Sequence, residues 1–284
     1  MIHMKIFMAA ASLALLTACS SDAQSAEEPA ESVEQQETEA AAEKEKVEKE
    51  AAEKAEREKA EAEAEAKAKA EAEKPEYKLN PAFWGFEPVN GASEEAVLIT
   101  IDDAPDKRSL EMAETLKEKG IPAIFFVNGH FLDTDEEKET LKKIHDMGFA
   151  IGNHTETHAI LPTISEEQQR EEILAVSKTI EETIGEKPKF FRAPQGANTD
   201  FSRELVAEEG MLLMNWTYGY DWEQQYMDAA ALTDIMVNSE FLQNGANLLM
   251  HDREWTAEAL PDIIDGLSKK GYSFIDPSKI EGVE

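Results

Sequence analysis

AVLITIDDAPDKRSLEMAETLKEKGIPAIFFV, residues 96–127, has the pattern of a strand, a helix and a second strand in direct succession. Ala96–Ile101 and Ala123–Val127 are short apolar runs, which are typical of strands buried on both faces. Between them, Arg108–Lys119 has helical periodicity, and Gly120 ends it because glycine readily adopts the left-handed conformation after a helix. Such a unit predicts two parallel strands with the helix packed against their face.

The same alternation continues to the end of the chain. The further predicted strands cover Ala150–Asn153, Phe190–Arg192, Leu212–Trp216, Asn247–His251 and Tyr272–Ile275. The further predicted helices cover Glu136–Met147, Ser165–Ile184, Phe201–Glu209, Leu232–Leu242 and Ala257–Lys270. About seven parallel strands with helices outside them fit either a barrel or an open doubly wound sheet. Polar residues follow several of these strands at their C-terminal ends, which favours the barrel because barrel active sites gather at that end.

The charge of the predicted domain restricts its partners. Residues 75–284 contain 41 acidic and 18 basic residues, a net charge of −23 out of −32 for the whole chain. A surface this acidic has no basic patch to neutralise phosphates, so nucleic acid is excluded as a partner. The composition suits a neutral substrate, or surroundings of high salt or high pH.

The N-terminus has the features of an export signal. Lys5 precedes an apolar run, Ile6–Leu16, that is too short to span a bilayer. Leu16-Thr17-Ala18 then places small residues directly before Cys19, the only cysteine of the chain. This arrangement resembles a bacterial lipoprotein signal, which predicts a signal peptide at 1–18 and a lipidated Cys19 anchored to the membrane. The alternative is a plain secretory signal that leaves an unpaired thiol.

Residues 19–74 are predicted to form a charged spacer between the anchor and the domain at 75–284. The stretch 26–74 consists almost entirely of Ala, Glu and Lys. No apolar stripe recurs at heptad spacing, so a coiled coil is not expected. Two alternatives remain open, a solvated helical spacer and a disordered tether.

Two neighbouring acids, Asp102 and Asp103, close the first strand of the domain. Side chains of adjacent residues at a strand end point in different directions, so one carboxylate can bind a metal while the other faces a substrate. The simpler interpretation is a turn or helix-capping acid before Pro105.

His154-Thr155-Glu156-Thr157-His158 follows the third strand. Histidines four residues apart can share a metal, although two surface histidines at this spacing also occur by chance. Two histidines and one carboxylate would leave a coordination position open for water, as hydrolytic metal sites require.

Two further side chains lie at strand ends. Arg192 follows the fourth strand, where it could orient a carboxylate or form a structural ion pair. His251 ends the apolar run Leu248-Leu249-Met250, where burial demands either a core hydrogen bond or a catalytic function.

Together, these stretches resemble the polysaccharide deacetylase family, a group of carbohydrate esterases that includes the rhizobial chitooligosaccharide deacetylase domain. The resemblance covers Val97–Ile275, and its motifs are specific in combination. It implies the fold of that family, a distorted (β/α)₇ barrel. The residues that carry it are Asp102-Asp103, His154–His158, Arg192–Gly196, Asp221-Trp222 and Leu248–Asp252.

The resemblance also implies the function of each residue. Asp103, His154 and His158 hold a divalent metal, usually Zn²⁺, with Co²⁺, Mn²⁺ or Ni²⁺ as alternatives. The metal polarises the acetamide carbonyl and lowers the pKa of bound water. Asp102 is the general base, oriented by Arg192.

On the leaving-group side, the resemblance makes His251 the general acid, kept charged by Asp221. The backbone N–H of Gln195, which follows Pro194, stabilises the oxyanion. Trp222 and Leu249 line the groove around the acetyl methyl group.

Three positions depart from the family pattern. Ala104 replaces the usual glycine after the paired aspartates, and Gln195 replaces an aromatic residue. An additional Asp that the family carries upstream of Asp221 is absent.

The expected activity is hydrolysis of N-acetyl groups on peptidoglycan N-acetylglucosamine by a monomeric, extracytoplasmic enzyme that is lipid-anchored to the cell membrane and faces the cell wall. N-acetylmuramic acid, a chitooligosaccharide or an O-acetylated or exported polysaccharide are alternative substrates, because loops set the choice of sugar in such folds. A wall-binding protein without turnover is the alternative from another class. Such a binding protein would be expected to have lost at least one residue of the set Asp102, Asp103, His154, His158 and His251.

Overall fold

The computed structural model describes residues 31–72 and 74–283. The chain divides after Lys67 into two compact units, which are described separately. The predicted signal peptide at 1–18, the lipidation of Cys19 and the spacer residues before Glu31 lie outside the described residues. The division at 1–18, 19–74 and 75–284 therefore stays a prediction.

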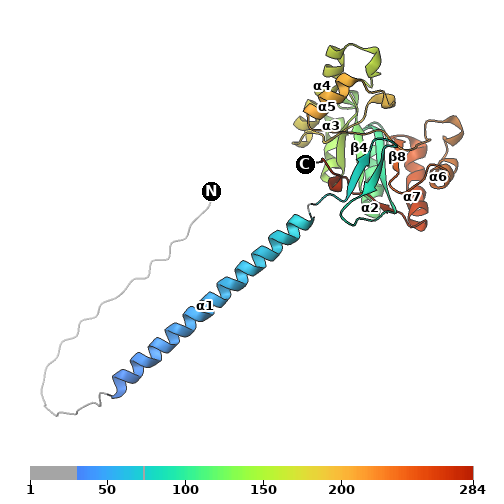
Figure 1. Ribbon diagram of the computed structural model, residues 1–284. Helices are drawn as coiled ribbons and strands as arrows, with labels where there is room; N and C mark the ends of the chain where they lie inside the picture. Colours follow the sequence, from blue (N-terminus) through green and yellow to red (C-terminus); the bar gives the residue numbers. More distant parts are fainter. Residues whose placement is uncertain (1–30, 73, 284) are drawn as a thin grey trace, which may run out of the picture. The chain divides into compact units, whose positions relative to one another are not determined.

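The described residues of the first unit, 31–67, belong to a long helix, α1, which covers Glu31–Ala72 (Figure 1). Ala, Glu and Lys are strong helix formers, and ion pairs one turn apart, such as Lys54–Glu58, add a little more. The described side chains of this helix are exposed. Among the described residues, no helix is both long and apolar enough to cross a membrane.

The second unit is built on a sheet of parallel strands. Its strands are β3 (Ala96–Ala104), β4 (Ala123–Val127), β5 (Ala150–Asn153), β6 (Phe190–Phe191), β7 (Leu212–Leu213), β8 (Asn247–His251) and β9 (Ser273–Phe274). They run in the order β7-β6-β5-β4-β3-β8, and β9 pairs with the N-terminal part of β3. Strand β3 is buried on both faces because helices cover one face and the barrel interior the other. Thr100 and Asp102 are polar residues on its interior face.

The sheet curls until its two ends meet. Beyond β7, Tyr218 forms a parallel bridge with Leu248 of β8. The Thr217 N–H donates to the Asn247 carbonyl at 2.8 Å, and the Leu249 N–H donates to the Tyr218 carbonyl at 2.9 Å. The barrel is distorted because the two ends of its sheet are joined by this isolated bridge and not by a full ladder. The distorted (β/α)₇ fold expected from the sequence is confirmed.

Helices surround the sheet in the order of their contacts, α6, α7, α2, α3, α4 and α5 (Figure 1). Their bounds are α2 Ser109–Lys119, α3 Asp135–Asp146, α4 Glu166–Ile184, α5 Asp200–Glu208, α6 Ala229–Asn238 and α7 Glu254–Lys269. Short 3₁₀ turns lie at Gly129–Phe131, Leu161–Thr163, Pro194–Gly196, Gln224–Tyr226 and Pro277–Lys279. Ser165 caps α4 in a reciprocal capping box with Gln168, as its sequence indicated.

Several element boundaries differ from the prediction. Helix α6 begins three residues earlier and ends four residues earlier than expected, because Asp228 caps it at one end and Ser239 turns to extended backbone at the other. Helix α7 also starts three residues earlier, at Glu254. The predicted strand Leu212–Trp216 shrinks to Leu212–Leu213, and the ladders of β6 and β9 are shorter than predicted.

A hairpin at the start of the domain escaped prediction. β1 (Tyr77–Asn80) and β2 (Gly85–Pro88) pair antiparallel in a segment rich in proline and aromatic residues. The Phe86 N–H donates to the Gly245 carbonyl at 2.7 Å, which ties the hairpin to the loop before β8. A Cβ at Gly245 would lie 1.8 Å from the Phe86 carbonyl oxygen, so only glycine permits this approach.

Candidate active site and metal centre

The three predicted metal ligands meet at the C-terminal ends of β3 and β5. One ligand atom from each of Asp103, His154 and His158 lies within 4.8 Å of the others. Asp103 Oδ1 is 3.7 Å from His158 Nε2 and 3.9 Å from His154 Nε2. Asp103 and His158 both have φ near +60°, a conformation that non-glycine residues adopt rarely and that functional sites retain.

These residues fit a bound transition metal. Two donors that share a tetrahedral ion at about 2.1 Å lie roughly 3.4 Å apart, close to the separations found here. His154 Nδ1 is 2.6 Å from the Arg192 carbonyl, so Nδ1 carries the proton and leaves the Nε2 lone pair free for a metal. Burial lowers the pKa of His154, which keeps its imidazole neutral, as a metal ligand must be.

Asp102 lies beside the metal ligands and is held by Arg192. Arg192 Nη1 donates to Asp102 Oδ1 at 2.6 Å, while Asp102 Oδ2 lies 3.5 Å from His154 Nε2. Arg192 is fully buried inside the barrel and also donates to Thr100 Oγ1 and the Asn215 carbonyl. A guanidinium fixed by these neighbours orients one oxygen of Asp102 and leaves the other facing the site.

His251 lies across the site from the histidine ligands. It is the register partner of Asp102 in the neighbouring strand, so the two side chains flank the same space. His251 Nδ1 is 2.7 Å from Asp221 Oδ1, and Asp221 Oδ2 accepts hydrogen bonds from the His251 N–H and Thr256 Oγ1. Burial lowers the pKa of His251, but the charge and hydrogen bond of Asp221, together with the charges of Asp102 and Asp103, raise that pKa overall.

A pocket of about 400 Å³ opens onto these groups. Its lining residues are Asp102, His154, His158, Gln195, Trp216, Trp222, Leu249 and His251. Of the predicted groove residues, Pro194 is buried and does not line the pocket. Gln195 lines it, with φ +56°, and the ring of Trp222 meets that of His251 edge-on at 5.5 Å.

Comparison with known proteins identifies the family. Residues 90–214 match the family model described as polysaccharide deacetylase. A peptidoglycan-N-acetylglucosamine deacetylase of Bacillus cereus is 30% identical over 195 residues, which cover 65% of this chain and 70% of that protein. The chain belongs to the polysaccharide deacetylase family.

Other relatives of the chain carry different names. The uncharacterized protein YlxY of Bacillus subtilis is 31% identical over 164 residues, or 57% of this chain and 50% of that protein. A peptidoglycan-N-acetylmuramic acid deacetylase of Bacillus subtilis is 26% identical over 192 residues, or 66% of this chain and 71% of that protein. The chain thus spans half of YlxY and 66% of a further Bacillus cereus deacetylase.

Solved structures of polysaccharide deacetylases share the fold. A peptidoglycan N-acetylglucosamine deacetylase has a TM-score of 0.62 at 26% identity, covering 73% of this chain and 94% of that chain. A pseudoenzyme of carbohydrate esterase family 4 from Bacillus anthracis has a TM-score of 0.59 at 27% identity, covering 65% and 64%. Because the fold is shared by enzymes and by a pseudoenzyme, the side chains in the pocket must carry the functional argument.

The sequence analysis assigned no function to three residues of this deacetylase domain. Trp216 lines the pocket, 6.5 Å from Trp222. Asp252, directly after β8, accepts hydrogen bonds from four successive backbone N–H groups, at residues 106–109, and so caps the start of α2. Arg253 pairs with the predicted ligand Asp103. Their only sequence signal is proximity to a motif residue, because their partners are far away along the chain.

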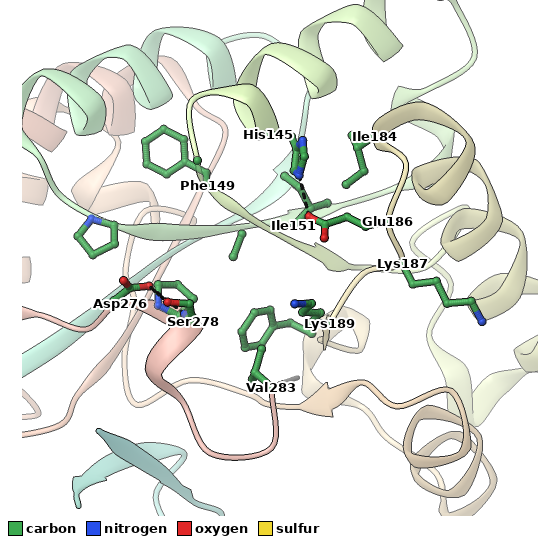
Figure 2. Close-up of a pocket in the computed structure, with 15 residues that line it drawn as sticks. His145, Phe149, Ile151, Ile184, Glu186, Lys187, Lys189, Asp276, Ser278 and Val283 are labelled. Carbon is green, nitrogen blue, oxygen red and sulfur yellow. Dashed lines mark hydrogen bonds and ion pairs between the residues drawn. The ribbon is translucent and has the colours of Figure 1, made fainter. Parts of the chain in front are cut away.

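A second hollow, also about 400 Å³, lies at the N-terminal ends of β4, β5 and β6 (Figure 2). His145 and Glu186 form an ion pair there at 2.7 Å, and Lys187 and Lys189 lie at its margin. None of the predicted site residues lines it. Parallel barrels place their chemistry at the opposite strand ends, so the metal centre is the candidate active site of this deacetylase domain.

Proposed function

We propose that this protein hydrolyses N-acetyl groups of a cell-wall polysaccharide, most specifically those on peptidoglycan N-acetylglucosamine, with the help of a divalent metal. The observation that carries the proposal is the convergence of a two-histidine, one-carboxylate ligand set, a second carboxylate and a paired imidazole around one pocket. Zn²⁺ is the expected metal, because it favours imidazole and carboxylate ligands in tetrahedral sites that keep one position open.

The metal, when bound at Asp103, His154 and His158, supplies a Lewis acid that polarises the acetamide carbonyl and lowers the pKa of water. Asp102 accepts the proton of the attacking water through the oxygen that Arg192 leaves free. The backbone N–H of Gln195 donates to the negative charge that develops on the acetamide oxygen.

His251 completes the reaction by donating a proton to the leaving amine of the sugar as the C–N bond breaks. Asp221 holds its Nδ1, which directs the opposite ring nitrogen toward the pocket. Trp222 and Leu249 offer an apolar wall for the acetyl methyl group.

The N-terminal sequence and the relatives support the proposed cellular setting. Curated relatives are named as deacetylases of peptidoglycan, which supports an extracytoplasmic site of action on the cell wall. A lipid on Cys19 would anchor a monomeric enzyme to the membrane. Palmitate labelling that disappears in a Cys19→Ala chain would test the anchor.

Chelation is the direct test of metal-dependent activity. Purified chain is expected to release acetate from peptidoglycan or chitooligosaccharides, to lose nearly all of this release after dialysis against EDTA, and to recover it with Zn²⁺ or Co²⁺. Acetate release should be lost without metal because the metal polarises the acetamide carbonyl and activates the attacking water. An absence of metal-dependent acetate from every N- or O-acetylated glycan would refute the proposal.

A second candidate substrate is N-acetylmuramic acid, which is favoured by the similarity to the Bacillus subtilis muramic acid deacetylase. Mass spectrometry of muropeptides from a deletion strain distinguishes the two sugars. A non-catalytic wall-binding function is less well supported, since Asp102, Asp103, His154, His158 and His251 are all present.

The pairing of His251 with Asp221 predicts a pH effect. Because the carboxylate raises the pKa of His251, the imidazole stays protonated to higher pH. The Asp221→Asn variant removes this adjacent opposite charge, so it is expected to lower the pKa of His251 and to move the alkaline limb of kcat/KM to lower pH. Glu254→Gln removes the same charge from an exposed position nearby and should leave the profile in place. An unchanged alkaline limb in Asp221→Asn would contradict His251 as the acid.

A further inference from the structure

Each of the two adjacent aspartates has an arginine of its own. Arg192, at the end of β6, pairs with Asp102, and Arg253, just beyond the end of β8, pairs with Asp103. The first pair is buried and belongs to the mechanism proposed above. The second involves a side chain that is about one-third exposed, at 36%, and that no predicted function uses.

The two oxygens of Asp103 face different partners. Oδ2 accepts a hydrogen bond from Arg253 Nη2 at 2.8 Å. Oδ1 is the atom that approaches the nitrogens of His154 and His158. With one oxygen engaged by the guanidinium, the carboxylate offers only the other oxygen to an ion in the site.

Further hydrogen bonds hold the Arg253 guanidinium and the backbone beside it in place. Its Nη1 donates to the Asp252 carbonyl at 3.1 Å, and the Asp252 N–H donates to the Asp102 carbonyl at 3.1 Å. The Asp252 carboxylate also accepts the N–H groups of residues 106–109, directly after the Asp103 loop. The backbones that carry the arginine and the aspartate are therefore tied together, and the ion pair is preorganised.

We propose that Arg253 is a positioning residue that holds Asp103 as a single-oxygen metal ligand, and that it thereby raises the affinity for small transition metals relative to Ca²⁺. Tetrahedral transition-metal sites use one oxygen of a carboxylate, whereas Ca²⁺ takes six to eight oxygens and often both from one carboxylate. The inference rests on the metal site of the proposed function and assigns Arg253 no contact with substrate.

The test is metal affinity in the absence of any glycan. The full chain, freed of metal, is titrated with Zn²⁺ and Co²⁺ against a chromophoric chelator, and separately with Ca²⁺. Arg253→Ala is expected to weaken Zn²⁺ and Co²⁺ binding by about 10–100-fold, the usual effect of removing a partner of a metal ligand. The visible Co²⁺ bands should also lose intensity, because a freed second oxygen raises the coordination number.

Two further variants make the result specific. Arg253→Lys keeps the charge and one donor, so it should recover part of the affinity. Arg108→Ala removes the same charge from a neighbouring side chain that pairs with Glu111 and Glu254, so it should bind metal as the parent does.

The possible outcomes separate this inference from the proposed function. Unchanged affinity and an unchanged Co²⁺ spectrum in Arg253→Ala, or tighter binding, would overturn the inference while leaving deacetylation intact. A parent chain that binds metal but releases no acetate would overturn the proposed function, and the affinity of Arg253→Ala would still decide the inference.

Discussion

The Asp102→Asn variant is expected to release acetate roughly 10²–10⁴-fold more slowly than the parent chain while it still binds metal, as removal of a general base predicts. Asp102 Oδ1 is engaged by Arg192, so the reacting proton must go to the other oxygen. An amide in that place cannot accept and retain a proton at neutral pH. The amide oxygen can still accept from Arg192, so the fold should persist with a lower Tm, because one partner of a buried ion pair loses its charge.

The measurements are initial rates of acetate release and metal content of the same preparation. Asp106→Asn is the matched control, because Asp106 follows in the same loop without lining the pocket, and its rate should equal that of the parent. If Asp102→Asn lost the metal as well, the assignments of Asp102 and Asp103 would be reversed.

His154→Ala and His158→Ala are expected to lose both metal and turnover. Each substitution removes one of three protein ligands. The Zn²⁺ affinity should therefore fall by more than the roughly 10–100-fold that is typical when a hydrogen-bond partner of a ligand is removed. His154 is fully buried, and its truncation leaves a cavity that also destabilises the fold. His158 is partly exposed, with 37% of its side chain accessible, so its variant should stay folded and give the cleaner result.

Metal content after dialysis, a Zn²⁺ titration and the far-UV circular dichroism spectrum check this prediction together. His145→Ala is the matched control, because His145 lies in the other hollow, at the opposite ends of the strands, and is paired with Glu186. A folded His158→Ala chain with full metal content and activity would rule out His158 as a ligand. Asp102, whose Oδ2 is 3.5 Å from His154 Nε2, would then be the next residue to test as a ligand.

Much of the fold could be predicted because its signals are local. Apolar runs such as Ala123–Val127 and helix ends such as Gly120 are encoded in a few neighbouring residues, and the structure has these elements at the predicted places. The β1–β2 hairpin was missed because its stability comes from contacts with Gly245 and Ile280, far along the chain. Helix α6 was misplaced because its apolar pattern continues past Ser239, where the backbone turns away.

The candidate site divides in the same way. The sequence alone determined the kinds of side chain and their order. Asp102, His154, Arg192 and His251 lie at or directly after the C-terminal end of an apolar strand. Aspartates, histidines and an arginine at these ends suited a metal site with an acid and a base nearby, while each residue alone also allowed a structural explanation. The resemblance to the polysaccharide deacetylases then gave each residue a function, and the family comparison confirmed the membership.

Only the tertiary structure decided which of these side chains touch. Asp221 reaches His251 across 30 positions of sequence, and Arg253 reaches Asp103 across 150. The first contact depends on the bridge between Tyr218 and Leu248, which brings the segment after β7 beside β8. The second depends on β3 and β8 being neighbours in a register that sets Asp102 beside His251. A hydrogen bond forms only within about 3 Å, and strand order and register, which arise from packing of the whole barrel, set that distance. No pattern of neighbouring residues encodes it.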